Sequence, residues 1–427
     1  MTLFRATVLD TPDDPFHGGT LRADSDCGLL VRDGVIVARD AFASLQSVHP
    51  EEDVVTLDDG VLLPGFVDTH VHFPQVRVIG GLGMPLLDWL EQCALPEEAK
   101  FADPSYAKSV AAEFVQGLVS AGTTSALVFG AHFAPAVDEL FSAASRAGIR
   151  ITSGLVVSDR LIREDLLTTP QQAYDDGLAL ARRWHGVGRS RYAVTPRFSL
   201  SCSNELLASC SDVLREVSGA AFTSHINENV HEIALVSKLF DLGHYLETYD
   251  QHDLIGPLSV VAHNVHPTDH ELKVLAIRGA SVAHCPTSNA ALGSGSFSLT
   301  RHVAYGVRVA LGSDVGAGTG FSLLKEGLQA YFAQQLLGEQ GYKLAPAHLL
   351  YLATTAGALA LGLPEVGHLG VGQRFDAQWV RPLPGSTLDV TLRHARDEED
   401  ALAKVFALGT PADVAGVWID GTTVWTR

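Results

Sequence analysis

Eight short apolar runs recur along the middle of the chain, and segments with helical character separate them. The runs are rich in β-branched residues, which is typical of strands buried on both faces of a parallel sheet. They cover residues 61–68 (VLLPGFVD), 123–130, 150–157, 191–198, 220–227, 258–265, 280–287 and 307–314. The helical segments cover residues 103–121, 136–147, 170–184, 204–217, 230–242, 268–278 and 299–305. This alternation predicts a (β/α)8 barrel, with a doubly wound open sheet as the alternative.

The two ends of the chain depart from this alternation. Residues 1–60 and 366–427 contain short strand-like pieces and turns, and neither end has the pattern of an independent core. We expect the two ends to pair into one small β-sandwich beside the barrel. The predicted domains are therefore 1–60 and 366–427 for the two parts of the sandwich, and 61–365 for the barrel. The acidic stretch 396–400 (RDEED) predicts the start of an exposed helix.

Charge and cysteine content limit the classes of partner. Lys and Arg total 30 against 49 Asp and Glu, which gives a net charge of −19. An acidic surface repels phosphate backbones and anionic lipid, so we expect neither a nucleic-acid nor a membrane partner. No signal-like N-terminus or long apolar stretch is present, which predicts a soluble, cytoplasmic protein. The 5 scattered cysteines contain no C-x-x-C pair, whereas histidines number 18, so imidazole and carboxylate are the expected ligands of any metal.

Polar side chains stand near the carboxyl ends of the predicted strands, where barrel enzymes build their active sites. These residues are His70, His72, His225, His263, His284 and Asp314. Residues two apart in an extended segment point to the same side, so His70 and His72 can face one ion. An isolated H-x-H is weak evidence, and histidines that only hydrogen-bond in the core are the alternative. The shared position at strand ends favours a metal site made by His70, His72, His225 and Asp314.

Three further residues near these ligands are candidates for catalysis. Glu228 follows His225 closely, and a carboxylate there can take a proton from water and pass it to a leaving group. Its alternative role is at the N-terminus of the helix that begins near Asn229. His263 is suited to hydrogen-bond the water or a developing oxyanion. For His284, a structural role and a site role are equally plausible.

Several motifs resemble those of the amidohydrolase superfamily. Residues 64–72 (PGFVDTHVH) resemble the family's opening strand, and SHINE, VVAHN, VAHCPTSN and LGSD follow in the family's order. The resemblance covers nearly the whole chain and indicates the deaminase-like branch with one metal. It implies one Zn²⁺ ion per subunit, held by His70, His72, His225 and Asp314. The lysine ligand of two-metal members is not expected, and the fourth predicted strand, RYAVTPRF, contains no lysine.

Further stretches are similar to guanine deaminases within this superfamily. They are HFPQ at 72–75, PLLDWL at 85–90, LPEE at 95–98 and TPRFSLSCS at 195–203. The resemblance implies that a metal-activated water deaminates guanine to xanthine and ammonia in a homodimeric enzyme. It assigns catalysis to Glu228, His263 and Asp314. It assigns substrate binding to Gln75, Arg197, Phe198, His225 and Glu228.

Alternative functions are suggested by segments that match the guanine deaminase pattern less closely. Residues 76–83 (VRVIGGLG), at the expected position of a substrate loop, follow the family only loosely. A related zinc aminohydrolase acting on another aminopurine, a pterin or a triazine is therefore the second hypothesis. A salt bridge at the barrel rim for Arg197 and plain core packing for Phe198 are the corresponding structural interpretations. A non-catalytic binding protein is the third hypothesis, and the complete set of ligand residues argues against it.

Overall fold

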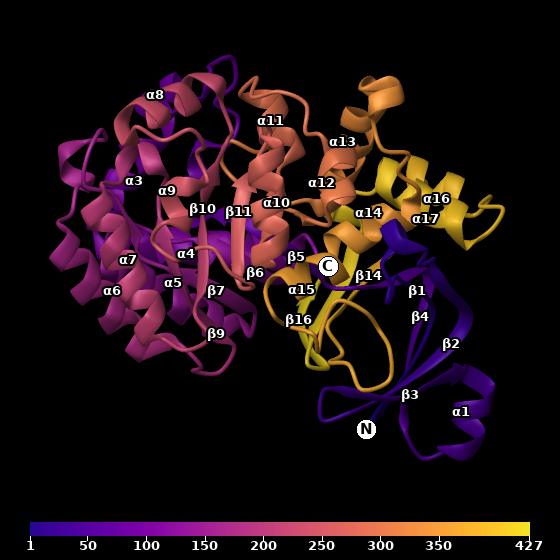
Figure 1. The fold of residues 1–427 in the computed structure, drawn as a ribbon. Coiled ribbons are helices and arrows are strands. Elements are labelled where there is room, and N and C mark those ends of the chain that lie inside the picture. Colours follow the sequence, from indigo (N-terminus) through magenta and orange to yellow (C-terminus); the bar gives the residue numbers. More distant parts are fainter.

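A computed structural model describes residues 1–427 and contains a parallel barrel (Figure 1). Its eight principal strands follow the order β13-β12-β11-β10-β9-β7-β6-β5, and the short β8 (Val156–Val157) pairs with β9. Their bounds are β5 Phe66–His72, β6 Thr123–Phe129, β7 Arg150–Gly154, β9 Ser190–Pro196, β10 Ala221–Ile226, β11 Ser259–His263, β12 Ser281–His284 and β13 Arg308–Leu311. The barrel predicted from the alternating pattern is confirmed.

The first and last strands of this order meet and nearly close the barrel. The Thr69 hydroxyl on β5 donates a hydrogen bond to the Leu311 carbonyl at 2.8 Å. Beyond the end of β13, the Asp314 amide donates to the His70 carbonyl at 2.8 Å. These contacts bring the carboxyl ends of β5 and β13 together, although they are more than 200 residues apart in sequence.

The predicted position of the first barrel strand, residues 61–68, is wrong. β4 (Asp53–Pro64) belongs to the terminal sheet, and β5 begins at Phe66 after the chain passes through Gly65. A Cβ atom at Gly65 would lie 2.2 Å from the Thr124 side chain, so only glycine permits this close approach. A continuous apolar run does not reveal where a chain leaves one sheet and enters another. As a result, His70 and His72 lie within β5.

Helices cover the outside of the barrel at the predicted positions. All seven predicted segments form helices whose ends agree with the prediction within two residues. They are α4 Pro104–Ser120, α5 Ala134–Ala147, α6 Pro170–Trp184, α7 Asn204–Glu216, α8 Val230–Phe240, α10 Asp269–Arg278 and α12 Leu299–Tyr305. Shorter helices that lie around the barrel mouth are α2 Leu86–Trp89, α3 Leu95–Glu98, α9 Glu247–Asp250 and α11 Pro286–Ala291. No helix combines the length and apolar character needed to cross a membrane.

The terminal segments together form one seven-stranded mixed sheet, in the order β16-β15-β14-β4-β1-β2-β3. Figure 1 shows the indigo N-terminal and yellow C-terminal strands side by side. Besides β4, the strands are β1 Thr2–Asp10, β2 Arg22–Arg32, β3 Val35–Ala41, β14 Ala377–Val380, β15 Val414–Ile419 and β16 Thr422–Thr426. β4 joins the two halves, because it pairs parallel with β1 and antiparallel with β14. It continues four residues beyond the predicted boundary at residue 60.

The remaining helices connect the barrel to this sheet or pack beside it. They are α1 Phe42–Val48, α13 Leu323–Leu336, α14 Pro346–Ala353, α15 Thr355–Ala360, α16 Thr387–Leu392 and α17 Glu398–Leu408. The acidic stretch opens α17 as predicted, and the Asp397 side chain caps that helix by accepting from the Asp400 amide. α17 packs against α13 and α14. The five cysteines form no disulfide.

Candidate active site

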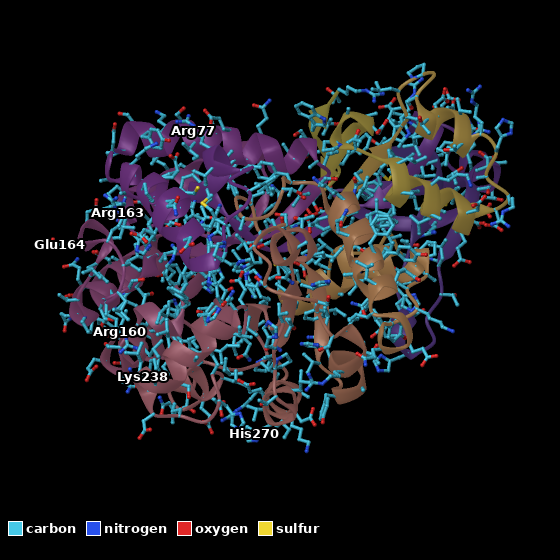
Figure 2. The ribbon with its side chains drawn as sticks, turned by 90° about the horizontal axis from the view of Figure 1, so that it is seen from above. Arg77, Arg160, Arg163, Glu164, Lys238 and His270 are labelled. Carbon is cyan, nitrogen blue, oxygen red and sulfur yellow. The ribbon has the colours of Figure 1, made fainter.

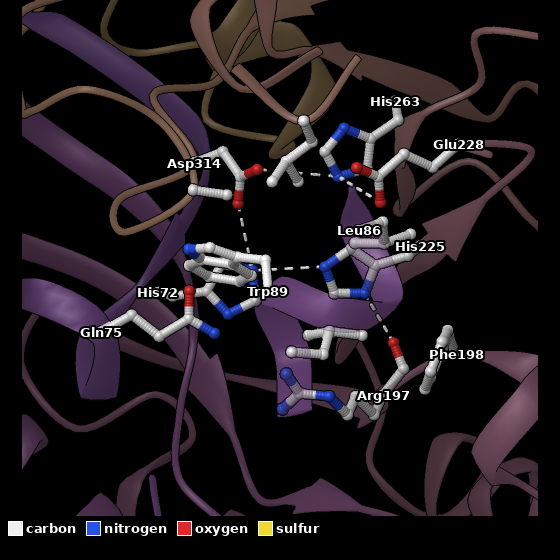
Figure 3. Close-up of a pocket in the computed structure, with 13 residues that line it drawn as sticks. His72, Gln75, Leu86, Trp89, Arg197, Phe198, His225, Glu228, His263 and Asp314 are labelled. Atoms are coloured by element: carbon white, nitrogen blue, oxygen red, sulfur yellow. Dashed lines mark hydrogen bonds and ion pairs between the residues drawn. The ribbon is translucent and has the colours of Figure 1, made fainter. Parts of the chain in front are cut away.

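A small pocket lies at the carboxyl ends of the barrel strands (Figure 3). It is lined by His72, Gln75, Leu86, Trp89, Leu90, Arg197, Phe198, His225, Glu228, His263, Leu292, Asp314 and Ala317. The structure therefore brings eight of the predicted site residues to one cavity. His70 contacts the lining residues His72 and Asp314 from the barrel interior and is fully buried.

The four predicted metal ligands lie close together, with His70, His72 and Asp314 in one possible metal-binding group and His70 and His225 in a second group with His263. His72 Nε2 lies 3.2 Å from His70 Nε2 and 3.2 Å from His225 Nε2. Asp314 Oδ1 lies 3.3 Å from His70 Nε2 and 3.2 Å from His72 Nε2. In a tetrahedral zinc site with bonds of about 2.1 Å, neighbouring ligand atoms are about 3.4 Å apart. The donor set and its spacing therefore fit a single divalent ion.

The protonation of the histidines supports the same conclusion. His225 Nδ1 donates to the Arg197 carbonyl oxygen at 2.6 Å, which leaves the lone pair of Nε2 facing the cluster. Burial, together with the neighbouring His70, lowers the pKa of His225 well below its usual value. Burial also lowers the pKa of His70 to about 4. These two imidazoles are neutral near pH 7, which is the form that binds a metal.

Asp68 links the two barrel strands that carry three of these ligands. Its Oδ1 accepts hydrogen bonds from the amides of His70 at 3.2 Å and Ser313 at 3.0 Å. Its Oδ2 accepts from the Ser313 hydroxyl at 2.5 Å. Burial raises the pKa of Asp68 to about 7. Asp68 appears in the opening sequence motif, but its partner Ser313 is 245 residues away, so this link is not visible in the sequence motif.

The backbone at the strand ends is strained where it carries site residues. His263 has φ +70°, Asn264 has φ +46° and Asp314 has φ +49°. Side-chain-bearing residues seldom adopt this left-handed region, and such strain concentrates at functional sites. The unusual conformations of His263 and Asp314 turn the chain immediately after β11 and beyond β13, at the pocket.

Glu228 is a buried carboxyl group beside the ligand cluster. His263 Nε2 lies 3.5 Å from Glu228 Oε2 and 3.8 Å from Asp314 Oδ2, and the Ser294 hydroxyl donates to Glu228 Oε1 at 3.2 Å. Burial, followed by the negative charge of Asp314, raises the pKa of Glu228 to about 8. This carboxyl group can therefore hold a proton near neutral pH. Asn229 caps α8, so Glu228 lies before the helix and points into the pocket.

Three of the predicted substrate-binding residues, Gln75, Arg197 and Phe198, line the pocket away from Glu228 and His263 (Figure 3). Gln75 lies in the 3-10 turn η2 (Phe73–Val78), and Arg197 and Phe198 follow β9. Arg197 forms a buried ion pair with Glu98, so it is both a salt-bridge residue and a lining residue. Phe198 likewise belongs to the main hydrophobic core and presents part of its surface to the pocket.

His284 lies outside the residues that line the pocket. Its ring stacks on Phe297 with 4.2 Å between ring centroids, and neither ring nitrogen has a hydrogen-bond partner. Burial lowers its pKa to about 3. His284 is therefore a neutral, packed side chain at the end of β12.

Apolar residues for which the sequence motifs indicate no role also line the pocket. Leu86 and Trp89 come from α2, and Leu90 begins the π-helical turn η3 (Leu90–Ala94). They lie in the PLLDWL stretch, which the family resemblance identified without implying a role for these residues. Residues 76–83, expected at the substrate loop, contribute no lining residue. Instead they contain left-handed glycines at 80 and 83 and lead the chain to α2.

An apolar groove of about 1590 Å³ adjoins the pocket and shares Leu90, Arg197 and Phe198 with it. Its rim includes Arg163 and Lys238, which Figure 2 shows along one edge of the barrel. The groove extends the pocket towards the surface, because exposed Leu161 also lines it.

Together, the parallel barrel, the His/Asp cluster at its mouth and the adjacent buried carboxyl group define the class of barrel hydrolases that activate water with a metal. The amidohydrolase family model matches residues 61–424, so the chain belongs to the amidohydrolase family.

Within this family, the chain is similar along its full length to guanine deaminases. A probable guanine deaminase from Deinococcus radiodurans is 57% identical, covering 100% of this chain and 99% of the relative. The solved Escherichia coli guanine deaminase superposes with a TM-score of 0.96 at 34% identity, covering 100% of both chains. A guanine deaminase from C. acetobutylicum, solved with guanine bound in its active site, superposes with a TM-score of 0.91 at 27% identity. The match covers 99% of this chain and 100% of that one.

Proposed function

We propose that the protein deaminates guanine hydrolytically, giving xanthine and ammonia. The observation that carries this function is the pocket itself, which places the His/Asp cluster, a proton-holding Glu228 and the side chains of Gln75 and Arg197 around one cavity. Full-length similarity to guanine deaminases supports the same substrate.

We propose one Zn²⁺ ion per subunit, held by His70, His72, His225 and Asp314. The neutral imidazoles and the spacing of 3.2–3.3 Å between ligand atoms support this assignment. When bound, such an ion lowers the pKa of water to about 7 and so supplies a nucleophile at neutral pH.

Three residues hold the substrate through two kinds of contact. Gln75 and Arg197 supply N–H groups for polar atoms on the edge of the ring, and Phe198 packs against its face. These contacts direct C2 of guanine towards the His/Asp cluster. His225 anchors this arrangement, because its hydrogen bond to the Arg197 carbonyl connects the two sides of the pocket.

Glu228 moves the protons of the reaction. In its ionised form it accepts a proton from the attacking water and delivers it to a ring nitrogen beside C2. It then takes the remaining proton from the hydroxyl group added at C2 and gives it to the departing amine, which leaves as ammonia while the C2 carbonyl forms. His263 Nε2, which lies 3.5 Å from Glu228 Oε2 and 3.8 Å from Asp314 Oδ2, is placed beside the oxygen that adds to C2 and stabilises it there.

We further propose that the protein is a homodimer in the cytoplasm and that its ligand is a small-molecule substrate. The family resemblance supports these proposals. Light scattering of the purified protein tests the dimer, for which the expected mass is twice the 45.5 kDa of one chain.

The experiment that tests the function is ammonia release from guanine, adenine, a pterin and an aminotriazine, with metal content measured on the same sample. Guanine is expected to give the highest kcat/KM, with xanthine formed in equal amount to ammonia. Turnover of adenine, the pterin or the triazine without turnover of guanine would instead establish the related-aminohydrolase alternative.

A further inference from the structure

Glu98 is a buried carboxylate that touches both polar recognition side chains of the pocket. It ends α3, is 2% exposed, and does not itself line the cavity. Its partners Gln75 and Arg197 do line it, and they are 23 and 99 residues away in sequence. A role for Glu98 in recognition rests on the proposed function, because it acts on the residues assigned to the substrate.

The contact with Gln75 determines which end of that amide can face the substrate. Gln75 Nε2 donates to Glu98 Oε1 at 2.7 Å, and Gln75 Oε1 accepts from the Gly316 amide at 3.3 Å. A carboxylate only accepts hydrogen bonds, so the amide cannot rotate without opposing Oε1 to Glu98. One N–H of Gln75 remains for the cavity.

The contact with Arg197 holds the guanidinium group in place and compensates its positive charge. Arg197 Nη1 donates to Glu98 Oε2, and His132 Nε2 lies 3.3 Å from the same oxygen. The Nε and Nη2 atoms of Arg197 make no hydrogen bond within the protein, so they remain available to a ligand. Burial acts to raise the pKa of Glu98, but Arg197, His132 and Gln75 outweigh it and hold the pKa well below its usual range. Glu98 therefore stays ionised and compensates the guanidinium charge.

We propose that Glu98 is the positioning residue for substrate recognition, which holds Gln75 and Arg197 so that both present N–H donors to acceptor atoms of a neutral heterocycle. In Figure 3 the Gln75 and Arg197 side chains approach the same side of the pocket, below His72 and His225. Because Glu98 cancels the charge of Arg197, the recognition edge suits a neutral ring with oxygen or nitrogen acceptors, and it offers no free cation for a phosphate.

The test is Glu98→Gln, with Glu97→Gln as the matched control. Glu97 is also buried, but it binds the Tyr106 hydroxyl and Lys100 and does not touch the pocket residues. In Glu98→Gln one oxygen becomes an NH2 group, so position 98 can no longer accept from both Gln75 and Arg197. We expect KM for guanine to rise about tenfold or more while kcat falls less than about threefold, because the reacting groups at the cluster are unchanged. Glu97→Gln is expected to leave both constants near the wild-type values.

A role confined to stability would move different quantities. Zinc content and Tm of each variant are measured alongside the kinetics. The rise in KM is expected even when the assay temperature lies well below the Tm of every variant. Gln75→Ala provides a second readout: adding Glu98→Gln to it should raise KM by clearly less than Glu98→Gln does alone, because part of the effect passes through Gln75. If Glu98→Gln does not fold, Glu98→Asp keeps the charge but withdraws the oxygens, and it should give the same rise in KM.

The outcomes separate this inference from the proposed function. If wild-type protein deaminates guanine and Glu98→Gln matches Glu97→Gln in KM, or if the effects of Gln75→Ala and Glu98→Gln multiply, the inference is overturned and the function stands. If wild-type protein does not deaminate guanine, the function fails. The same comparison is then made with whichever of adenine, the pterin or the triazine is turned over, and a rise in KM there still supports the role of Glu98.

Discussion

Buried acidic groups occur in two regions of the molecule, and the two regions treat them differently. Where the terminal sheet meets the barrel, the buried carboxylates of Asp10 and Asp376 each pair with arginine. Asp10 is fully buried and accepts from Arg22 Nε at 2.8 Å and Arg39 Nη1 at 3.1 Å. Asp376 accepts from Arg150 Nε at 2.9 Å. Charges at this junction are therefore neutralised within the fold.

At the barrel mouth the buried acids lack such partners. Asp68, Glu228, Asp314 and Glu326 contact histidine, serine, threonine or backbone groups, and none forms an ion pair with arginine or lysine. Burial raises the pKa of Glu228 and of Glu326 to about 8. Charge at the junction therefore stabilises the fold, whereas the carboxyl groups at the mouth remain available to bind a cation and to transfer protons. The Glu98–Arg197 pair is the exception at the mouth, and it lies on the recognition side.

The largest expected effect follows from replacing Glu228, the acid at the barrel mouth that moves protons. Glu228→Gln is expected to lower kcat by about 10²–10⁴-fold, because the amide cannot carry a proton between water and the amine. Zinc content should stay at the wild-type level, since Glu228 is not among the four converging ligands. Steady-state kinetics and metal analysis of one preparation check both, and a near-normal kcat would exclude Glu228 as the proton carrier.

The junction should respond in stability and not in turnover. Asp10→Asn leaves Arg39 with a weakened partner in a buried setting, so the free energy of unfolding is expected to fall by about 3 kcal/mol. Asp24→Asn is the control, because Asp24 also pairs with Arg39 but is 45% exposed at its side chain and should cost less than about 1 kcal/mol. Urea unfolding measures both changes. A large loss of kcat in folded Asp10→Asn would contradict the division of roles.

A smaller effect concerns the pH dependence of stability. Burial raises the pKa of Glu326 to about 8 in the folded protein from its ordinary value of 4.5, so the folded state binds more protons between these values. Stability contributed by this group therefore falls as pH rises through that window. Between about pH 6 and pH 8, Glu326→Gln should lose about 1–2 kcal/mol less stability than wild type.

The control for this prediction is Glu399→Gln, which removes an exposed carboxylate from α17. Its stability should follow the wild-type dependence on pH. Urea unfolding at a series of pH values, with saturating zinc throughout, gives the slopes. Parallel slopes for wild type and Glu326→Gln would show that Glu326 is ionised throughout this range.

The sequence predicts the features that depend on local periodicity. The strand and helix alternation located the barrel, and the two-residue spacing of His70 and His72 placed both on one face of β5. Features that depend on distant contacts escaped it. Gly65 separates two sheets only because Thr124 approaches it, and Glu98 meets Gln75 and Arg197 only after the barrel closes. Apolar residues such as Trp89 carry no chemical signature that would distinguish a pocket wall from core.

Zinc titration of metal-depleted protein, with guanine turnover measured at each step, tests whether His70, His72, His225 and Asp314 form one metal site that supports catalysis. With the four converging ligands as one site, activity should rise linearly and reach its plateau at one ion per chain. Asp314→Asn, which removes the carboxylate ligand, should require a large excess of zinc and recover little activity. Full guanine deamination in protein without metal, or a plateau at two ions per chain, would contradict the account.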